Sequence, residues 1–515
     1  MTGRLLLAVL FASGAGSLGS LAAQADRPPV GPSGQPTIDT VIIQNHNIFD
    51  RDSDDAAPNW VAKLANGLHQ RTRQWVVRRR LLLERGNQFD LARMEESERA
   101  LRSLGVFRQV RVDTVRTDGK LALRAVTADG WSTQPQASFS SVGGDKVWQA
   151  GFVERNLLGT ATEFALTYAH NPDRNRLDFE FINPQIFGRR TLLLTRYSSL
   201  SDGKRGEWQF GVPFTETAAR NSVETYGEAA DERLLQFKSD TLLRVQQHRL
   251  LRLGLTGGIA LHATTHAYAR LWGGWEWRRE DYADSGVTAW PYSTFTAVRA
   301  GIDVGSVRFR VLEHFNSYAR REDVDLSPTL HVGAVVQSGL GYEISGQASI
   351  VWARGFAVVR VNANGLDSTR TTGGVTVVSQ DVPRHTFIAH AEAGVVTHAR
   401  LGHEFDPWMD QRGPRLFGVH DFTGTRMTWF VLEDRILVVD DILGLMAMGL
   451  APFVDYGGAW YGDQTPQQGG DAGLSIRFGP TRAVSGEAAE VAVGYRFGLV
   501  RGGPWAITIR KGFSF

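Results

Sequence analysis

The last eleven residues, Trp505-Ala-Ile-Thr-Ile-Arg-Lys-Gly-Phe-Ser-Phe515, decide how the rest of the chain is interpreted. Odd positions are almost all apolar or aromatic, and even positions are small or polar. This period of two is that of a β-strand with one apolar face. Such a strand occurs in a soluble β-sandwich and equally in the wall of a membrane-spanning barrel.

The same alternation recurs from about Gln134 to the end of the chain, for example in residues 163–168, 177–181 and 208–214. Turn sequences such as Ser201-Asp202-Gly203 separate the segments. Roughly 385 residues follow Trp131, and at about 24 residues per strand and connection they supply about 16 strands. The soluble alternative is a large β-sandwich or propeller, but no repeat of propeller-blade length is present. Together with the terminal Phe515 and the export signal described below, this predicts that residues 131–515 form a transmembrane antiparallel β-barrel.

The composition agrees with a barrel that is polar inside. The chain has 515 residues, with 56 glycines, 14 tryptophans and 27 phenylalanines, and its mean hydropathy is −0.21. Glycine at turns, aromatics at the two membrane interfaces and polar side chains facing inward account for all three features. A net charge of +2 argues against a nucleic-acid partner, and the absence of cysteine excludes disulfides and cysteine-ligated metals.

The amino-terminal segment predicts export. Residues 1–25 place Arg4 before an apolar run and end at Ala23-Gln24-Ala25, which is typical of a cleaved signal peptide. The alternative, a short membrane anchor, is disfavoured because glycines and serines shorten the apolar core below the roughly 20 residues that a spanning helix needs. Residues 26–36 contain four prolines and are predicted to be a linker.

Residues 37–130 differ from everything after them and predict a small α+β unit. Residues 37–49 and two stretches, 107–112 and 121–126, are typical of strands. Helices are expected over 60–68 and 75–85, and a further helix capped by Asp90 is expected to stop at Gly105. With residues 50–73, which contain the first of these helices, taken as an insertion, the expected order of the unit is β-α-α-β-β.

Signatures of catalysis are missing from the sequence. HExxH, GxSxG and GxxxxGK[ST] motifs are absent, and the histidines at 385, 390, 398 and 403 are too scattered to predict a metal site. We therefore expect no enzyme activity and no cofactor. The run Arg78-Arg79-Arg80 is either a solvated helix face or a contact with anionic lipid or a partner.

Several stretches carry a resemblance to a known family: residues 76–112, Arg155-Asn-Leu-Leu-Gly159, residues 453–457 and 473–477, and Phe513-Ser514-Phe515. In this order they resemble the outer-membrane β-barrel assembly superfamily, the bacterial surface antigen family that includes BamA and TamA. The first stretch resembles the POTRA domain of that family, the second a segment of an early barrel strand, the next two its late-strand signatures, and the last its carboxy-terminal signal. The resemblance implies one POTRA-like domain at 37–130 in the periplasm and a barrel at 131–515 in the bacterial outer membrane.

The resemblance also implies a loop that folds into the barrel lumen and pairs an arginine with acidic residues of nearby strands. The acidic counterparts here are Glu433 and Asp455. The loop motif is blurred: Arg412-Gly413 keeps the dipeptide and is favoured, Arg415 is the substitute, and Gly418 marks an alternative that lacks the arginine. Two carboxylates in a lumen need a cation or their pKa values rise. Alternatively, they simply face a wet lumen.

Closure of the barrel requires its first and last strands to pair. The expected seam joins residues 136–142 to the final strand, which carries Trp505, Ile507, Ile509, Phe513 and Phe515. The resemblance implies an assembly, insertion or translocation barrel that captures client strands through the POTRA-like domain and this weak seam. Expected partners are the outer-membrane bilayer, unfolded barrel or secreted clients, and accessory envelope proteins. The alternative is a passive channel or a surface-exposed structural barrel.

Overall fold

The computed structural model describes residues 36–49, 59–117, 119–142, 145–238, 240–284, 293–318, 321–409, 412–484, 488–499 and 502–511. The predicted signal peptide (1–25), nearly all of the predicted linker, and Phe513 and Phe515 lie outside these residues. None of the helices in the described ranges has the length and apolar character needed to cross a bilayer.

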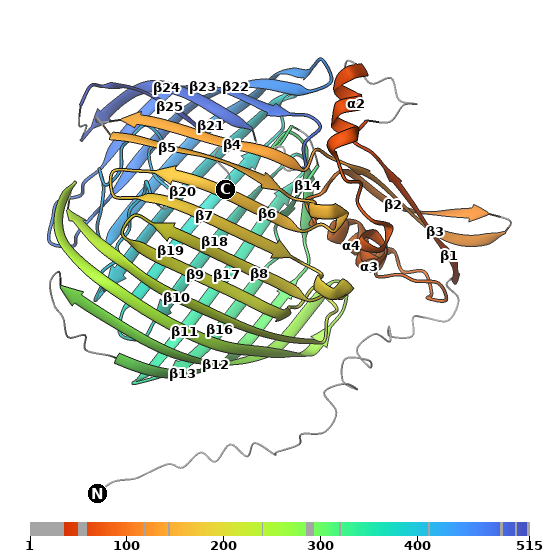
Figure 1. The fold of residues 1–515 in the computed structure, drawn as a ribbon, viewed down its shortest axis with the longest axis horizontal. Helices are drawn as coiled ribbons and strands as arrows, with labels where there is room; N and C mark the ends of the chain where they lie inside the picture. The colour runs from red at the N-terminus through yellow and green to blue at the C-terminus, as the bar shows by residue number, and fades with distance from the viewer. Residues whose placement is uncertain are drawn as a thin grey trace, which may run out of the picture.

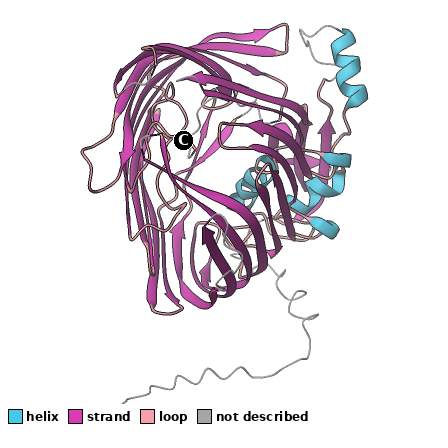
Figure 2. Ribbon diagram, turned by 60° about the vertical axis from the view of Figure 1, so that its left-hand side comes forward, coloured by secondary structure: helices cyan, strands magenta, loops and turns pink. Residues whose placement is uncertain are grey.

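A closed antiparallel barrel of 20 strands makes up most of the described chain (Figures 1 and 2). The strands follow one another round the ring in sequence order, and the last, β25, closes on the first, β4. They are β4 (Thr133–Val142), β5 (Asp145–Glu154), β6 (Glu163–His170), β7 (Asn175–Asn183), β8 (Leu192–Leu200), β9 (Gly203–Val212), β10 (Asn221–Lys238), β11 (Thr241–Ala263), β12 (Ala267–Asp284), β13 (Ser293–Ser306), β16 (Thr329–Val336), β17 (Leu340–Trp352), β18 (Gly355–Gly365), β19 (Thr369–Ser379), β20 (His385–Thr397), β21 (Arg426–Ile442), β22 (Met446–Trp460), β23 (Gly469–Pro480), β24 (Ala489–Gly498) and β25 (Trp505–Lys511).

The predicted number of about 16 strands is therefore wrong. The first six strands have only 8 to 10 residues each and follow one another within residues 133–212. Strand length varies widely, since β11 alone has 23 residues. One average spacing applied to the whole chain consequently undercounts the short strands.

Outward and inward side chains alternate along the barrel strands. On β11, Leu251, Leu253 and Leu255 are 41–46% exposed on the outer face. On β22, Val454 is 45% exposed whereas the next residue, Asp455, is 1% exposed. The outer face of the barrel is therefore apolar although it is open to the surroundings, and charged groups such as Asp455 are turned inward.

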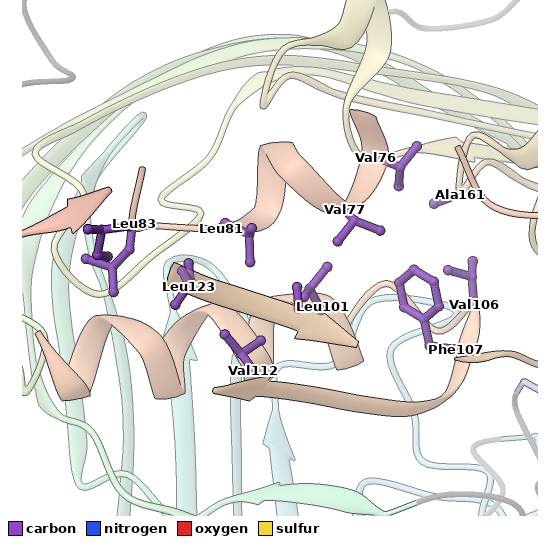
Figure 3. Packing of buried hydrophobic residues seen from close by; sticks show 12 residues of the cluster. Val76, Val77, Leu81, Leu83, Leu101, Val106, Phe107, Val112, Leu123 and Ala161 are labelled. Carbon is purple, nitrogen blue, oxygen red and sulfur yellow. The ribbon is translucent and has the colours of Figure 1, made fainter. Parts of the chain in front are cut away.

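The amino-terminal unit packs helices on a three-stranded sheet. Its elements are β1 (Ile38–His46), α2 (Asn59–Leu68), α3 (Gln74–Arg80), α4 (Leu91–Arg102), β2 (Phe107–Thr117) and β3 (Lys120–Asp129). The central strand β3 runs parallel to β1 and antiparallel to β2. Figure 3 shows the core between the sheet and the helices, formed by residues such as Val77, Leu101, Phe107 and Leu123.

The helix expected over 75–85 ends at Arg80. Leu81 and Leu83 both point into the core and are only 3% and 1% exposed. Residues at positions i and i+2 face the same side when the chain is extended, so this segment is extended and not helical. The N–H of Leu82 donates to the Ser97 hydroxyl of α4 at 2.9 Å, so α4 holds this segment extended. α4 begins as expected, with the Asp90 carboxylate accepting from the N–H of Arg93.

Two short 3₁₀ turns of the barrel hold the amino-terminal unit: η1 (Leu157–Gly159), between β5 and β6, and η2 (Ile186–Gly188), between β7 and β8. Near η1, the Asn156 side chain donates to the Thr72 hydroxyl at 2.9 Å, and the N–H of Arg73 donates to the Gly159 carbonyl at 2.9 Å. Gly159 has φ +72°, and a Cβ there would lie 2.5 Å from the Arg71 carbonyl oxygen. Only glycine fits this contact.

The connection between β13 and β16 packs against the inner wall of the barrel. It contains the hairpin β14 (Phe309–Leu312) and β15 (Glu322–Asp325). Leu312, Phe315 and Leu326 bury against inward side chains of β18, β19 and β20. On its other side, β15 meets the amino-terminal unit, where Asp323 accepts from Arg102 of α4 at 2.5 and 2.8 Å. Residues 307–328 thus bridge the unit and the lumen.

Candidate functional site: the lumen loop and the barrel seam

The long connection between β20 and β21 enters the lumen, and we call its described residues, 398–409 and 412–425, the lumen loop. The Arg415 side chain lies near its middle and is 1% exposed. Its Nε is 2.6 Å from Asp455 of β22, its Nη2 is 2.8 Å from Glu433 of β21, and its Nη1 is 3.8 Å from Glu490 of β24. One guanidinium therefore joins three neighbouring parts of the wall.

The electrostatics of Arg415 favour the charged form. Burial alone would lower the pKa of the guanidinium, but Asp455, Glu433 and Glu490 outweigh it and raise the pKa well above its usual value. The guanidinium also lies 3.9 Å from the centre of the Phe453 ring. Buried charges are tolerated when they are paired and hydrogen-bonded, as this one is.

The backbone on either side of this contact is also fixed to the wall. The N–H of Arg415 donates to Asp455 at 3.2 Å, and the N–H of Leu416 donates to Asp471 at 2.8 Å. Phe417 and Phe422 of the loop bury against one another and against the wall. The loop is thus seated by ion pairs, backbone hydrogen bonds and apolar packing together.

The network extends from Glu433 to the connection between β13 and β16. Glu433 also pairs with Arg435, and Arg435 donates to the carbonyl of Phe315 at 2.7 Å and to the Asn316 side chain at 3.1 Å. Phe315 and Asn316 belong to the connection between β13 and β16. Glu433 therefore links the lumen loop to the connection that contacts the amino-terminal unit.

The sequence favoured Arg412 over Arg415 as the partner of Glu433 and Asp455, and the structure contradicts that preference. Arg412 has a 37% exposed side chain and pairs with Glu392 at 3.2 Å. Its N–H donates to the Pro407 carbonyl at 2.6 Å in a turn that continues through Gly413 at φ +94°, so its side chain is directed elsewhere. Arg415 is the arginine next to the buried pair Leu416 and Phe417, and this adjacency is the sequence signal that identifies it.

Gly418 lies beside the site without contacting the acidic pair. Its N–H donates to the Asp421 carboxylate at 2.7 Å. A Cβ at this position would lie 3.4 Å from both Asp421 and the Val142 carbonyl, which is ordinary contact. Gly418 therefore supports a turn of the lumen loop.

A second anchor of the lumen loop, His420, is missed by sequence reasoning. Its two ring nitrogens lie 2.9 Å from Asp173, in the β6–β7 connection, and 2.5 Å from Asp406 of the same loop. The ring stacks on Phe237, with centroids 3.6 Å apart. Burial lowers the pKa of His420, but hydrogen bonds to the two carboxylates outweigh it and raise the pKa to about 9. Only the fold brings Asp173 next to residues so far along the chain.

The seam between β4 and β25 is joined by two residue pairs among the described residues, Thr508 with Ser140 and Ile509 with Phe139. On its other side, β25 pairs with β24 along its whole described length. Trp505, Ile507 and Ile509 are 69%, 51% and 40% exposed, on the outer face of the barrel. β25 therefore forms far fewer residue pairs with β4, where the barrel closes, than with β24.

A cavity of about 1060 Å³ lies between the lumen loop and the wall and reaches this seam. Its lining includes Ser140 and Thr508, which face the lumen, and also Phe139 and Ile509, which face outward. The cavity therefore reaches the two strands that close the barrel. Among the described residues, including those of this cavity, no three acidic or histidine side chains are arranged to hold a metal ion.

The fold and site define a closed barrel with an ion-paired lumen loop and a short closing seam. No protein-family model matches the chain. No curated protein sequence matches it either.

Among solved structures, similar folds include BamA from Haemophilus ducreyi lacking POTRA domains 1-3 (10% identity, 92% of this chain and 84% of that chain, TM-score 0.37). CdiB from Escherichia coli is also similar (9% identity, 93% and 91%, TM-score 0.44), as is the siderophore receptor PirA from Pseudomonas aeruginosa (11% identity, 79% and 87%, TM-score 0.36). All three TM-scores are below 0.5.

Proposed function

We propose that this chain is an outer-membrane barrel that inserts or translocates client proteins, with its amino-terminal unit in the periplasm as a POTRA-like domain. The apolar outer face, exemplified by Leu251, Leu253 and Leu255, supports a membrane location. In such an environment every unpaired backbone group is costly, so an incompletely paired strand edge has a strong tendency to acquire a partner strand.

The observation that carries this proposal is the short seam beside the lumen cavity. Only Thr508–Ser140 and Ile509–Phe139 join β25 to β4 in the described chain. Opening these two pairs exposes two strand edges to which a client hairpin can add. The cavity lined by residues of both strands gives that client a polar path on one side and the bilayer on the other.

The amino-terminal unit offers a second place for strand addition. In its sheet order, β1-β3-β2, both β1 and β2 are edge strands. An extended client segment that pairs with such an edge gains main-chain hydrogen bonds with little demand on its sequence. This role needs no catalytic group and no cofactor. Accessory envelope proteins are proposed as further partners.

The alternative is a passive channel, and the lumen loop argues against it. Arg415 and His420 attach this loop to the wall at two points, so the lumen is occupied along part of its height. A channel that conducts steadily requires an open lumen. We therefore prefer the assembly or translocation role.

A disulfide across the seam tests the proposal. The chain has no cysteine, so Ser140→Cys with Thr508→Cys creates a single possible bridge between directly opposed residues. The oxidised protein, reconstituted in liposomes, should lose its ability to accelerate insertion of an unfolded barrel client, and a reductant should restore it. Ala363→Cys with Thr371→Cys, opposed on β18 and β19, is the matched control and should keep activity.

Two results would contradict the proposal. One is unchanged client insertion in the oxidised seam variant. The other is steady ion conduction by the unmodified protein in planar bilayers without any acceleration of client insertion, which would favour the passive channel.

A further inference from the structure

Two consecutive turns on the side of the amino-terminal unit hold apolar side chains out into the surroundings. Leu158 of η1 is 63% exposed and Phe187 of η2 is 82% exposed. Both have left-handed backbone, φ 55° and 56°, a conformation that residues with a Cβ rarely adopt. In both turns the following glycine is also left-handed, and its N–H donates to the carbonyl three residues earlier, at 2.8 and 3.1 Å.

The two turns lie at the ends of strands that carry an aromatic outer face. η1 precedes β6, which begins at Glu163, and η2 follows β7, which ends at Asn183. Between them, the rings of Phe164 and Phe179 contact edge to face with centroids 5.4 Å apart, and Phe164 also lies 5.7 Å from Phe152. The apolar outer face therefore extends to these turns, and Leu158 and Phe187 lie at its rim.

Arginines surround the same turns. The sequence supplies them from the segment that ends in α3 and from the residues after η2: Arg71, Arg73, Arg78, Arg79, Arg80, Arg189 and Arg190. Five of these seven are exposed, and Arg80 and Arg190 are half-buried. Among the described residues, Arg190 alone in this set has a carboxylate partner, Glu216 at 3.4 Å.

Contacts fix this positive charge at the turns. Arg73 donates to the Leu158 carbonyl at 3.1 Å, Arg80 donates to the Pro184 carbonyl at 3.2 Å, and Arg190 donates to the Arg79 carbonyl at 3.3 Å. These carbonyls are neutral, so they do not compensate the charge of Arg73 and Arg80, whereas Arg190 also pairs with Glu216. Burial, and to a lesser extent the nearby Arg190, lowers the pKa of Arg80 to about 10.

We propose that this surface, the arginine rim, defined by Leu158, Phe187 and the seven arginines, binds the phosphate headgroups of anionic lipids in the adjacent leaflet. The two apolar side chains enter the interface while the guanidiniums bind phosphate oxygens. The occupant is a lipid because exposed apolar groups and unpaired cations lie together at the edge of the apolar outer face. The proposal rests on the membrane location proposed above.

Single cysteines make the rim testable in the full-length protein. Phe187→Cys carries an environment-sensitive fluorophore, and the protein is reconstituted in vesicles of phosphatidylethanolamine with or without phosphatidylglycerol. Quenching by a nitroxide on the acyl chain of either lipid gives the relative affinity of the site for the two headgroups. We expect clear preference for phosphatidylglycerol at position 187.

Charge removal tests the role of the arginines. Arg79→Gln and Arg189→Gln, added to the labelled protein, should each reduce the preference by about fivefold, as expected for one cation at an anionic surface. Arg111→Gln removes an exposed arginine of the same unit, on β2, that pairs with Asp113 and is not one of the seven, and it should leave the preference unchanged. Leu443→Cys labels another exposed apolar residue with left-handed backbone, in the β21–β22 turn, and should show weaker headgroup preference.

A label on the outer wall separates failure of this proposal from failure of the membrane location. Leu253→Cys, midway along β11, should be quenched in either lipid if the barrel spans the bilayer. Quenching at 253 with equal headgroup affinity at 187 overturns the rim proposal alone, whereas no quenching at 253 overturns the membrane location. Inorganic phosphate that abolishes the preference at 187 would identify a site for soluble anions and would also overturn the proposal.

Discussion

Replacing Arg415 by leucine should release the lumen loop from the wall. The change removes contacts of 2.6 Å to Asp455 and 2.8 Å to Glu433 and leaves both carboxylates buried without this cation. Breaking a buried pair in this way costs about 3–5 kcal/mol, which corresponds to a roughly 10²–10⁴-fold larger population of the released loop. Hydrogen exchange of the amides of residues 412–424 in the reconstituted protein measures that population directly.

Arg412→Leu is the matched control, because it removes an arginine of the same loop. The Arg412 side chain is 37% exposed, so its pair with Glu392 contributes at most about 1 kcal/mol. A second test combines Arg415→Leu with Asp455→Asn, which removes the carboxylate closest to the lost guanidinium and should recover part of the protection. Equal exchange in the Arg412 and Arg415 variants, or no change in either, would refute the reasoning.

Three further predictions concern the other attachments of the barrel. The pKa of His420 is raised from 6.5 to about 9, so the charged ring stabilises the lumen loop fully below pH 6.5 and this stabilisation, roughly 3 kcal/mol, is lost as the pH rises through 9. Hydrogen exchange of the loop should rise across that window. A His420→Gln variant that retains the same pH dependence would disprove the assignment. Gly159→Val places the Cβ of a branched side chain 2.5 Å from the Arg71 carbonyl oxygen at φ +72°. This clash should loosen the amino-terminal unit enough for a protease to cleave between the unit and the barrel. Unchanged protease resistance would contradict the proposed close approach of Gly159 and Arg71. Arg102→Gln should weaken the attachment of α4 to Asp323 by about 1 kcal/mol and increase exchange in the connection between β13 and β16, with exchange of β11 as the internal reference.

The kind of fold was accessible from the sequence because strand alternation is a local property. Each residue in a barrel strand faces either the lumen or the outside, so the pattern in Trp505, Ile507 and Ile509 can be recognised without knowing any neighbour. Phe513 and Phe515 belong to the same pattern but lie outside the described residues. The amino-terminal unit was likewise delimited by local signals, such as the Asp90 cap.

The number of strands and the cation in the lumen depended on the tertiary structure. Closure at 20 strands results from short hairpins in one part of the ring and long ones in another, and an average spacing contains no such information. Arg412 and Arg415 are equivalent by residue type, and the path of the loop decides which one meets Asp455. His420 depends on Asp173 in the same way.

Sequence by itself therefore determined the barrel class, the small unit before it and the acidic residues that required a cation. The tertiary structure decided which arginine supplies that cation, how few residues close the seam, and that arginines from two distant segments gather around Leu158 and Phe187. The physical reason is range: alternation and capping involve residues a few positions apart, whereas ion pairs in a lumen and charge at a rim join residues that only the closed barrel brings together.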